Sequence, residues 1–171
     1  PLLVMLLIPF NNFVLYPAIE RMGVKLTALR KMGAGIAITG LSWIVVGTIQ
    51  LMMDGGSALS IFWQILPYAL LTFGEVLVSA TGLEFAYSQA PKAMKGTIMS
   101  FWTLSVTVGN LWVLLANVSV KSPAVTEQIV KTGMSVTAFQ KFFFAGFAIL
   151  AAIIFALYAR CYQMQDHYRQ V

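Results

Sequence analysis

The acidic and hydroxyl side chains best placed for chemistry lie in a long apolar stretch over residues 57–90. Glu75 stands near its middle, where an acid within a membrane costs about 2.5–3.5 kcal/mol unless it is protonated, paired or hydrated. At about 100° per residue, Ser79 lies one helical turn from Glu75 on the same face, and Leu83 lies one turn further. This stripe fits a helix that lines a wet cavity with a hydrophobic constriction toward the cytoplasm. A buried acid bonded to a neighbouring helix is the alternative.

A second acid and an aromatic residue extend this set. Glu84 comes nine residues after Glu75 and falls on nearly the opposite face, so we expect it to stabilise helix packing or to meet a basic residue. In the next apolar stretch, Met99 and Trp102 are three residues apart and share one side of a helix. A tryptophan at mid-depth indicates an aromatic wall of a substrate pocket, with core packing as the alternative. Several Ser and Thr residues in the same stretch argue against a lipid-facing helix.

Enzyme, metal and nucleic-acid chemistry find little support in the composition. The chain has one cysteine, Cys161, and one histidine, His167, which cannot build a disulfide framework, a zinc site or a haem pair. Neither supplies a nucleophile with a positioned base, and no phosphate-cradling motif is present, so we expect no enzyme, no metal, no cofactor and no use of ATP. The formal charge of +5 comes from basic residues scattered between apolar runs, so nucleic acid is not an expected partner.

The composition indicates a membrane protein that carries these residues on helices. Of 171 residues, 59% are hydrophobic and 10% are charged, with a mean hydropathy of +0.82. A soluble domain carries about 25% charged residues, and a bilayer core of ~30 Å needs roughly 20 helical residues. The apolar stretches therefore predict an all-α polytopic membrane protein with five transmembrane helices, over about 1–20, 32–53, 58–90, 96–120 and 138–161.

Glycine and proline recur within these stretches. Gly40 and Gly47 are seven residues apart on nearly one face of the second stretch, which favours close helix packing through small residues. Pro9 and Pro67 each remove an internal backbone donor and can bend the helices of the first and third stretches. Membranes tolerate such bends where neighbouring helices or cavity water satisfy the freed carbonyl.

The distribution of basic residues predicts the orientation. Short loops rich in Lys and Arg stay in the cytoplasm, and eight of the eleven basic residues fall on one side of the predicted spans. These eight are Arg21, Lys25, Arg30, Lys31, Lys92, Lys95, Arg160 and Arg169. Pro1 is then outside and Val171 is in the cytoplasm. An odd number of spans and a start without methionine indicate the C-terminal part of a larger transporter-like protein, integral to the cell (inner) membrane.

The run from Gly74 to Lys95 carries a family resemblance. It reads GEVLVSATGLEFAYSQAPKAMK, and its LEF-x-YSQAP-x-x-MK portion is the most specific part. The opening segment over 1–20, which ends in LYPAIE, adds to it. On these residues the chain resembles the proton-coupled oligopeptide transporter (POT) family of the major facilitator superfamily, with the resemblance densest over 74–112 and weak from 119 onward.

The resemblance implies helices eight to twelve of a twelve-helix fold, in which two six-helix bundles rock around a central site. In the family, the position matching Glu75 faces the cavity and binds the peptide amino terminus, the position matching Ser79 lies beside it, and Trp102 matches a pocket aromatic. The positions that close the cytoplasmic gate match Leu83, Tyr87, Lys95 and Met99.

The resemblance also implies a function, namely proton-coupled symport that imports di- and tripeptides by alternating access, with the proton as coupling ion. The expected partners are then peptides, protons, the lipid bilayer and the missing N-terminal helices of the same polypeptide. A major facilitator transporter of another small solute is the main alternative, and a channel or structural membrane subunit is a further one.

Overall fold

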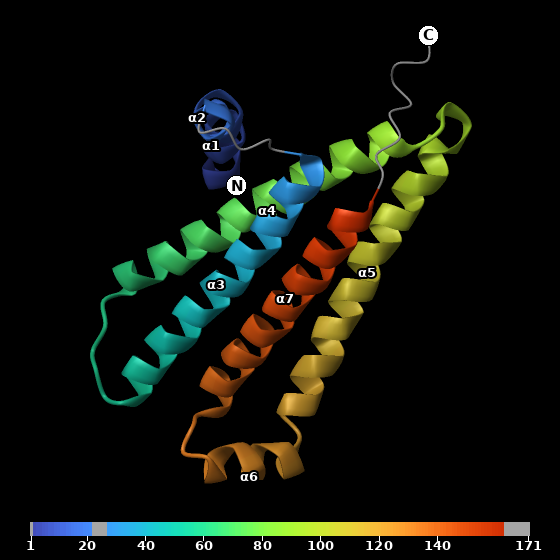
Figure 1. The fold of residues 1–171 in the computed structure, drawn as a ribbon. Helices are drawn as coiled ribbons and strands as arrows, with labels where there is room; N and C mark the ends of the chain where they lie inside the picture. The colour runs from blue at the N-terminus through green and yellow to red at the C-terminus, as the bar shows by residue number, and fades with distance from the viewer. Residues whose placement is uncertain (1, 22–26, 163–171) are drawn as a thin grey trace.

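The computed structural model describes residues 2–21 and 27–162, which form helices joined by turns (Figure 1). The first rod consists of α1 (Leu2–Phe10), a π-helical turn (Asn11–Leu15) and α2 (Tyr16–Arg21). The long helices are α3 (Ala28–Asp54), α4 (Ile65–Gln89), α5 (Lys95–Val120) and α7 (Val136–Cys161). Short 3-10 turns (Ile61–Gln64 and Lys92–Met94) precede α4 and α5, and α6 (Pro123–Lys131) links α5 to α7. No strand occurs within the two described ranges, so the predicted all-α class is confirmed.

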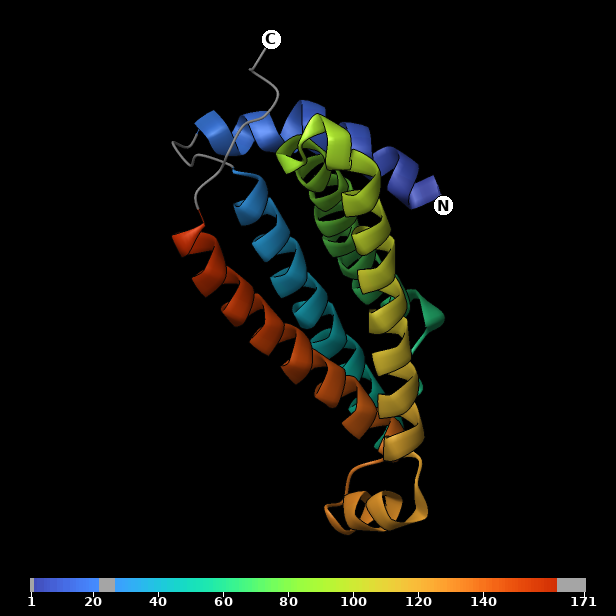
Figure 2. The ribbon, with the colours of Figure 1, turned by 90° about the vertical axis from the view of Figure 1, so that its right-hand side faces the viewer.

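Four of the described helices are long and apolar enough to cross a membrane: Ala28–Asp54, Ile61–Gln89, Lys95–Val120 and Val136–Cys161. The apolar helix over Leu3–Ile19 is shorter, and it runs across the ends of the long helices rather than alongside them (Figure 2). Pro9 and the π-helical turn after it interrupt the α-helical hydrogen bonding of this segment. Where the sequence predicted five spans, the described residues therefore contain four helices with the length and apolarity of a span.

Helix α3 is the centre of the bundle because glycines allow two neighbours to approach it closely. A Cβ at Gly35 would lie 2.8 Å from the backbone oxygen of Gly74 on α4. On the side facing α7, a Cβ at Gly40 would lie 3.1 Å from Ile149, and one at Gly47 would lie 2.9 Å from the ring of Phe142. The prediction that Gly40 and Gly47 serve close helix packing is confirmed.

Pro67 lies in the first turn of α4, directly after the 3-10 turn over Ile61–Gln64. An α-helix accepts proline in its first turn because the first backbone N–H groups have no partner within it. Pro67 is buried, and its carbonyl oxygen accepts a hydrogen bond from Ser42 Oγ on α3 at 2.7 Å. This bond fixes the start of α4 against the middle of α3.

Helix α5 stands apart from the other long helices (Figures 1 and 2). None of the residues in its most apolar window is buried within the described chain. At its far end, Gln140 Nε2 of α7 donates a hydrogen bond to Asn117 Oδ1 of α5. Large apolar side chains such as Phe101, Leu104 and Leu111 are exposed along α5, and burying them requires lipid or further protein.

Candidate functional site

One face of α4 carries the predicted binding and gate residues in a single exposed row. Glu75, Ser79, Leu83 and Tyr87 follow one another at intervals of four residues, and all four are exposed. The opposite side of α4 is buried, with Leu77 only 4% exposed where it meets Gly35 of α3. The helical period therefore separates a packed face of α4 from a face that is exposed within this chain.

The carboxylate of Glu75 has no hydrogen bond or ion pair with any other residue in the described ranges 2–21 and 27–162. Its side chain is exposed on α4 between buried Gly74 and buried Val76. An acid on an apolar helix that is not neutralised by a neighbouring helix is open to a cationic ligand or to water. Within the described chain, no neighbouring helix buries Glu75, so the alternative of a buried acid depends on helices outside this chain.

Trp102 of α5 reaches α4 at Gly82. A Cβ at Gly82 would lie 2.5 Å from Cη2 of Trp102, so only glycine admits the half-buried indole at this point. Gly82 comes seven residues after Glu75, which is about two helical turns or ~10 Å along the same face of α4. The indole therefore covers part of the face that carries Glu75, at a level between Ser79 and Leu83 and toward the carboxyl end of α4.

Two of the four predicted gate residues meet directly at the α4–α5 turn. The Nζ atom of Lys95 lies 4.0 Å from the centroid of the Tyr87 ring, within the range of a cation–π contact. Together with the contact of Trp102 at Gly82, this pair sets an antiparallel register between the two helices. Met99 falls between Lys95 and Trp102 on α5, so this register places it at the level of Leu83 on α4. Its side chain is half-buried.

Four hydroxyl groups of α5 do not by themselves require a wet surface. Each of the four donates a hydrogen bond to a backbone carbonyl of its own helix three or four residues earlier, at 2.7–3.2 Å. A satisfied hydroxyl can face lipid without leaving a polar group unpaired. The residues concerned are Ser100, Thr103, Ser105 and Thr107.

Glu84 lines a hollow of about 360 Å³ between α3 and α4, apart from the row that begins at Glu75. Lys31 and Thr81 also line it, so the acid and a basic residue share one polar space, in keeping with the expectation for Glu84. Lys31 Nζ lies 3.7 Å from the centroid of the Tyr16 ring, which ties the start of α2 to α3.

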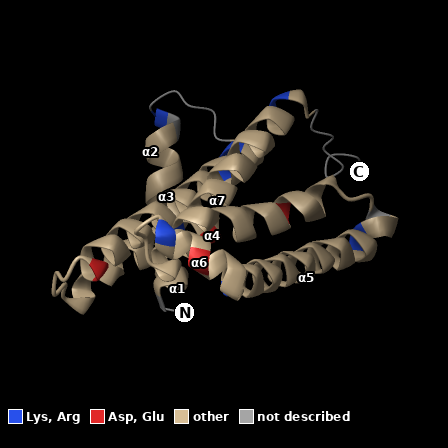
Figure 3. Ribbon diagram, turned by 90° about the horizontal axis from the view of Figure 1, so that it is seen from below, with Lys and Arg blue, Asp and Glu red and all other residues tan. Residues whose placement is uncertain are grey.

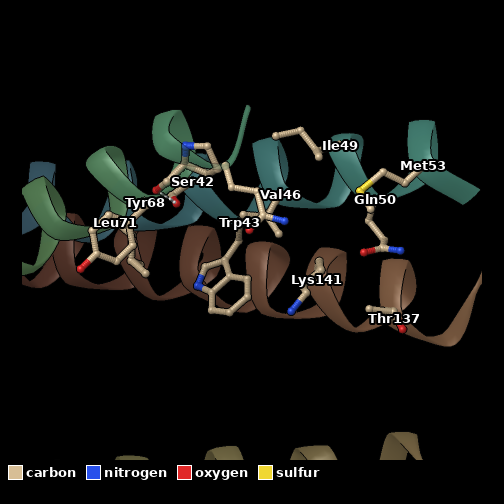
Figure 4. A pocket seen from close by; sticks show the side chains of 12 residues that line it. Ser42, Trp43, Val46, Ile49, Gln50, Met53, Tyr68, Leu71, Thr137 and Lys141 are labelled. Atoms are coloured by element: carbon tan, nitrogen blue, oxygen red, sulfur yellow. Dashed lines mark hydrogen bonds between the residues drawn. The ribbon is translucent and has the colours of Figure 1, made fainter. Parts of the chain in front are cut away.

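A second hollow of about 360 Å³ was missed by sequence reasoning (Figure 4). It lies between α3, α4 and α7 and is lined by Trp43, Gln50, Tyr68 and Lys141 among others. Lys141 Nζ stands 5.3 Å from the centroid of the Trp43 ring. The available signal was a lysine within the otherwise apolar start of α7, since a charge there needs a partner. Neither this hollow nor the one beside Glu84 is lined by Glu75.

The charged side chains are spread along the chain rather than gathered. In Figure 3 most of the ribbon is free of charge, and Lys and Arg lie mainly near helix ends. Across residues 2–21 and 27–162, no three His, Cys, Asp or Glu side chains come together in a group that could hold a metal ion. The exposed row on α4 is therefore the candidate site.

Comparison with known proteins gives consistent matches. A family model described as the POT family matches residues 1–131. The solute carrier family 15 member 1 of Oryctolagus cuniculus is 40% identical over 106 residues, which are 62% of this chain and 13% of that protein. A crystal structure of the POT family transporter PepTSo is 97% identical, with a TM-score of 0.90 over 98% of this chain and 33% of that one. A crystal structure of an auto-inhibited POT family peptide transporter is 65% identical, with a TM-score of 0.95 over 100% of this chain and 34% of that one.

The described helices thus match part of a larger fold. The chain spans about a third of the solved structures that it resembles and a smaller share of the curated relative. With four helices long and apolar enough to span a membrane, it is a segment of an integral membrane protein.

Proposed function

Because the chain belongs to the POT family, a family of transporters and not of enzymes, we propose that it is the C-terminal part of a proton-coupled symporter that imports di- and tripeptides. In this proposal the rod over 2–21 and the four long helices are helices eight to twelve of a twelve-helix major facilitator fold. The match to about a third of a POT family peptide transporter supports it. Transport proceeds by alternating access, with the proton as coupling ion and without ATP.

The observation that carries the proposal is the unpaired carboxylate of Glu75 on the open face of α4. A peptide presents a cationic amino terminus, and a charge-assisted hydrogen bond to a carboxylate is about twice as strong as a neutral one. Ser79, one turn away and also exposed, supplies a hydroxyl to the same ligand. Trp102, which contacts α4 at Gly82, gives the peptide an apolar wall on the side of Glu75 toward the carboxyl end of α4.

The turn between α4 and α5 acts as the inner gate in this proposal. Tyr87 and Lys95 already hold the two helices together there, and Leu83 and Met99 form an apolar constriction one turn closer to the ligand. Passage then requires α4 and α5 to separate or tilt as a hairpin, which the sparse packing of α5 against its neighbours allows. In this proposal the gate opens toward the cytoplasm, because the loops rich in Lys and Arg stay on that side of the inner membrane.

Uptake of a labelled dipeptide by the full-length protein in liposomes tests the proposal. With a proton gradient imposed, the dipeptide should accumulate above its external concentration, and without the gradient it should only equilibrate. Equilibration under both conditions would indicate a channel, and accumulation of a different solute alone would indicate another cargo. Glu75→Gln should abolish accumulation, whereas the control Glu127→Gln should not, because Glu127 pairs with Lys131 on α6 at 2.9 Å and is 71% exposed.

A further inference from the structure

A cavity of about 260 Å³ opens between the first turns of α3 and the last turns of α7. Figures 1 and 2 both show these two helix ends side by side. Arg30 and Arg160 line this cavity together with small residues, among them Gly33 and Ala156. Within the described part of the chain, no carboxylate lines the cavity and no residue of α4 or α5 contributes to it. Two arginines therefore line this cavity, which is separate from the peptide face on α4.

Two exposed rows of side chains continue from the arginines toward the middle of the helices. Each row advances by four, then three, then four residues, so it stays on one face of its helix. Each row begins with an arginine, passes an alanine and ends in an aliphatic side chain. On α3 and α7 respectively the rows are Arg30, Ala34, Ala37, Leu41 and Arg160, Ala156, Ile153, Ile149.

The dimensions of these rows fit one leaflet of a bilayer. Eleven residues of helix rise about 16 Å, which is close to half of the ~30 Å hydrocarbon core. The arginines at the ends of two membrane helices then stand at the height of lipid headgroups, and the aliphatic residues stand near the middle of the membrane. The small side chains next to the arginines leave the cavity open at that end of the two rows, and we call this cavity and the exposed rows that continue from it the groove.

We propose that this groove binds an anionic phospholipid, with its phosphate on Arg30 and Arg160 and an acyl chain along the two rows. A guanidinium group matches a phosphate bidentately and is the preferred side chain for such contacts. Basic pockets between membrane helices favour anionic headgroups in this way. A zwitterionic lipid gains less, because no lining carboxylate in the described chain pairs its ammonium group.

Native mass spectrometry of the full-length protein tests this site. The delipidated protein is titrated with phosphatidylglycerol and, separately, with phosphatidylcholine of the same acyl chains. We expect the tightest phosphatidylglycerol site to be at least tenfold weaker in the Arg30→Gln/Arg160→Gln variant. Ala156→Leu keeps both charges but fills the groove at an exposed position, and it should weaken the same site severalfold. The control Arg21→Gln removes an exposed arginine outside the cavity and should leave the site unchanged.

Three results would overturn the proposal. The first is phosphatidylglycerol affinity within twofold of the unmodified protein in both groove variants. The second is equal affinity for phosphatidylcholine, which would make the groove an apolar surface without charge selectivity. The third is full displacement of the lipid by millimolar inorganic phosphate, which would identify a phosphate ion site instead. Because lipid occupancy is measured directly, the outcome does not depend on whether peptide uptake is confirmed.

Discussion

Replacing Gly82 with alanine perturbs the contact that holds Trp102 against the Glu75 face of α4. The added Cβ would lie 2.5 Å from Cη2 and 3.0 Å from Cζ3 of the indole. Because carbon atoms in ordinary contact are ~3.5–4.0 Å apart, the indole must retreat by roughly 1 Å. Such a shift separates α5 from α4 at the height of the proposed gate.

The size of the effect follows from two opposing contributions. Overpacking of this kind costs about 1–3 kcal/mol, whereas alanine in a helix is favoured over glycine by about 1 kcal/mol. Gly109→Ala is a matched control, because Gly109 lies in α5 and a Cβ there meets nothing within 4 Å. We therefore expect Gly82→Ala to be about 1–3 kcal/mol less stable than Gly109→Ala.

Thermal unfolding of the purified full-length variants measures this difference. Trp102→Phe lacks the two atoms that the new Cβ would strike, so adding Gly82→Ala to Trp102→Phe should cost little beyond Trp102→Phe alone. The reasoning is refuted if Gly82→Ala is as stable as Gly109→Ala. It is refuted equally if Gly82→Ala lowers stability by the same amount whether residue 102 is tryptophan or phenylalanine.

Three further predictions concern transport and topology. Loss of the charge in Glu75→Gln should weaken dipeptide affinity about 10- to 100-fold, since a charged hydrogen bond contributes ~1.5–3 kcal/mol; unchanged binding in equilibrium dialysis would contradict this role. Leu83→Ala should alter the maximal uptake rate more than the affinity, because a gate controls passage; a collapse of affinity at constant rate would make Leu83 a pocket residue. In a Cys161→Ser background, an impermeant thiol reagent applied to intact cells should label a cysteine at Lys131 and not one at Lys92; the reverse pattern would invert the topology.

The sequence by itself determined the properties that arise from local order along the chain. Hydropathy predicted helices in all the described apolar stretches, because backbone hydrogen bonds within a helix do not depend on distant residues. The four-residue spacing of Glu75, Ser79 and Leu83 predicted that they share one face of a helix, because the helical period brings such residues together. The spacing of Gly40 and Gly47 likewise predicted a packed face, although not the helix that packs on it.

Only the tertiary structure decided how the helices lie against one another. The contact of Trp102 with Gly82 and the pairing of Tyr87 with Lys95 depend on the register between α4 and α5, which no periodicity within either helix contains. The same holds for Arg30 and Arg160, which are 130 positions apart and reach one cavity because α3 and α7 pack antiparallel through small residues. Helix rotation and crossing angle are set by the fit of side chains from different segments, so these sites appear only when the segments meet.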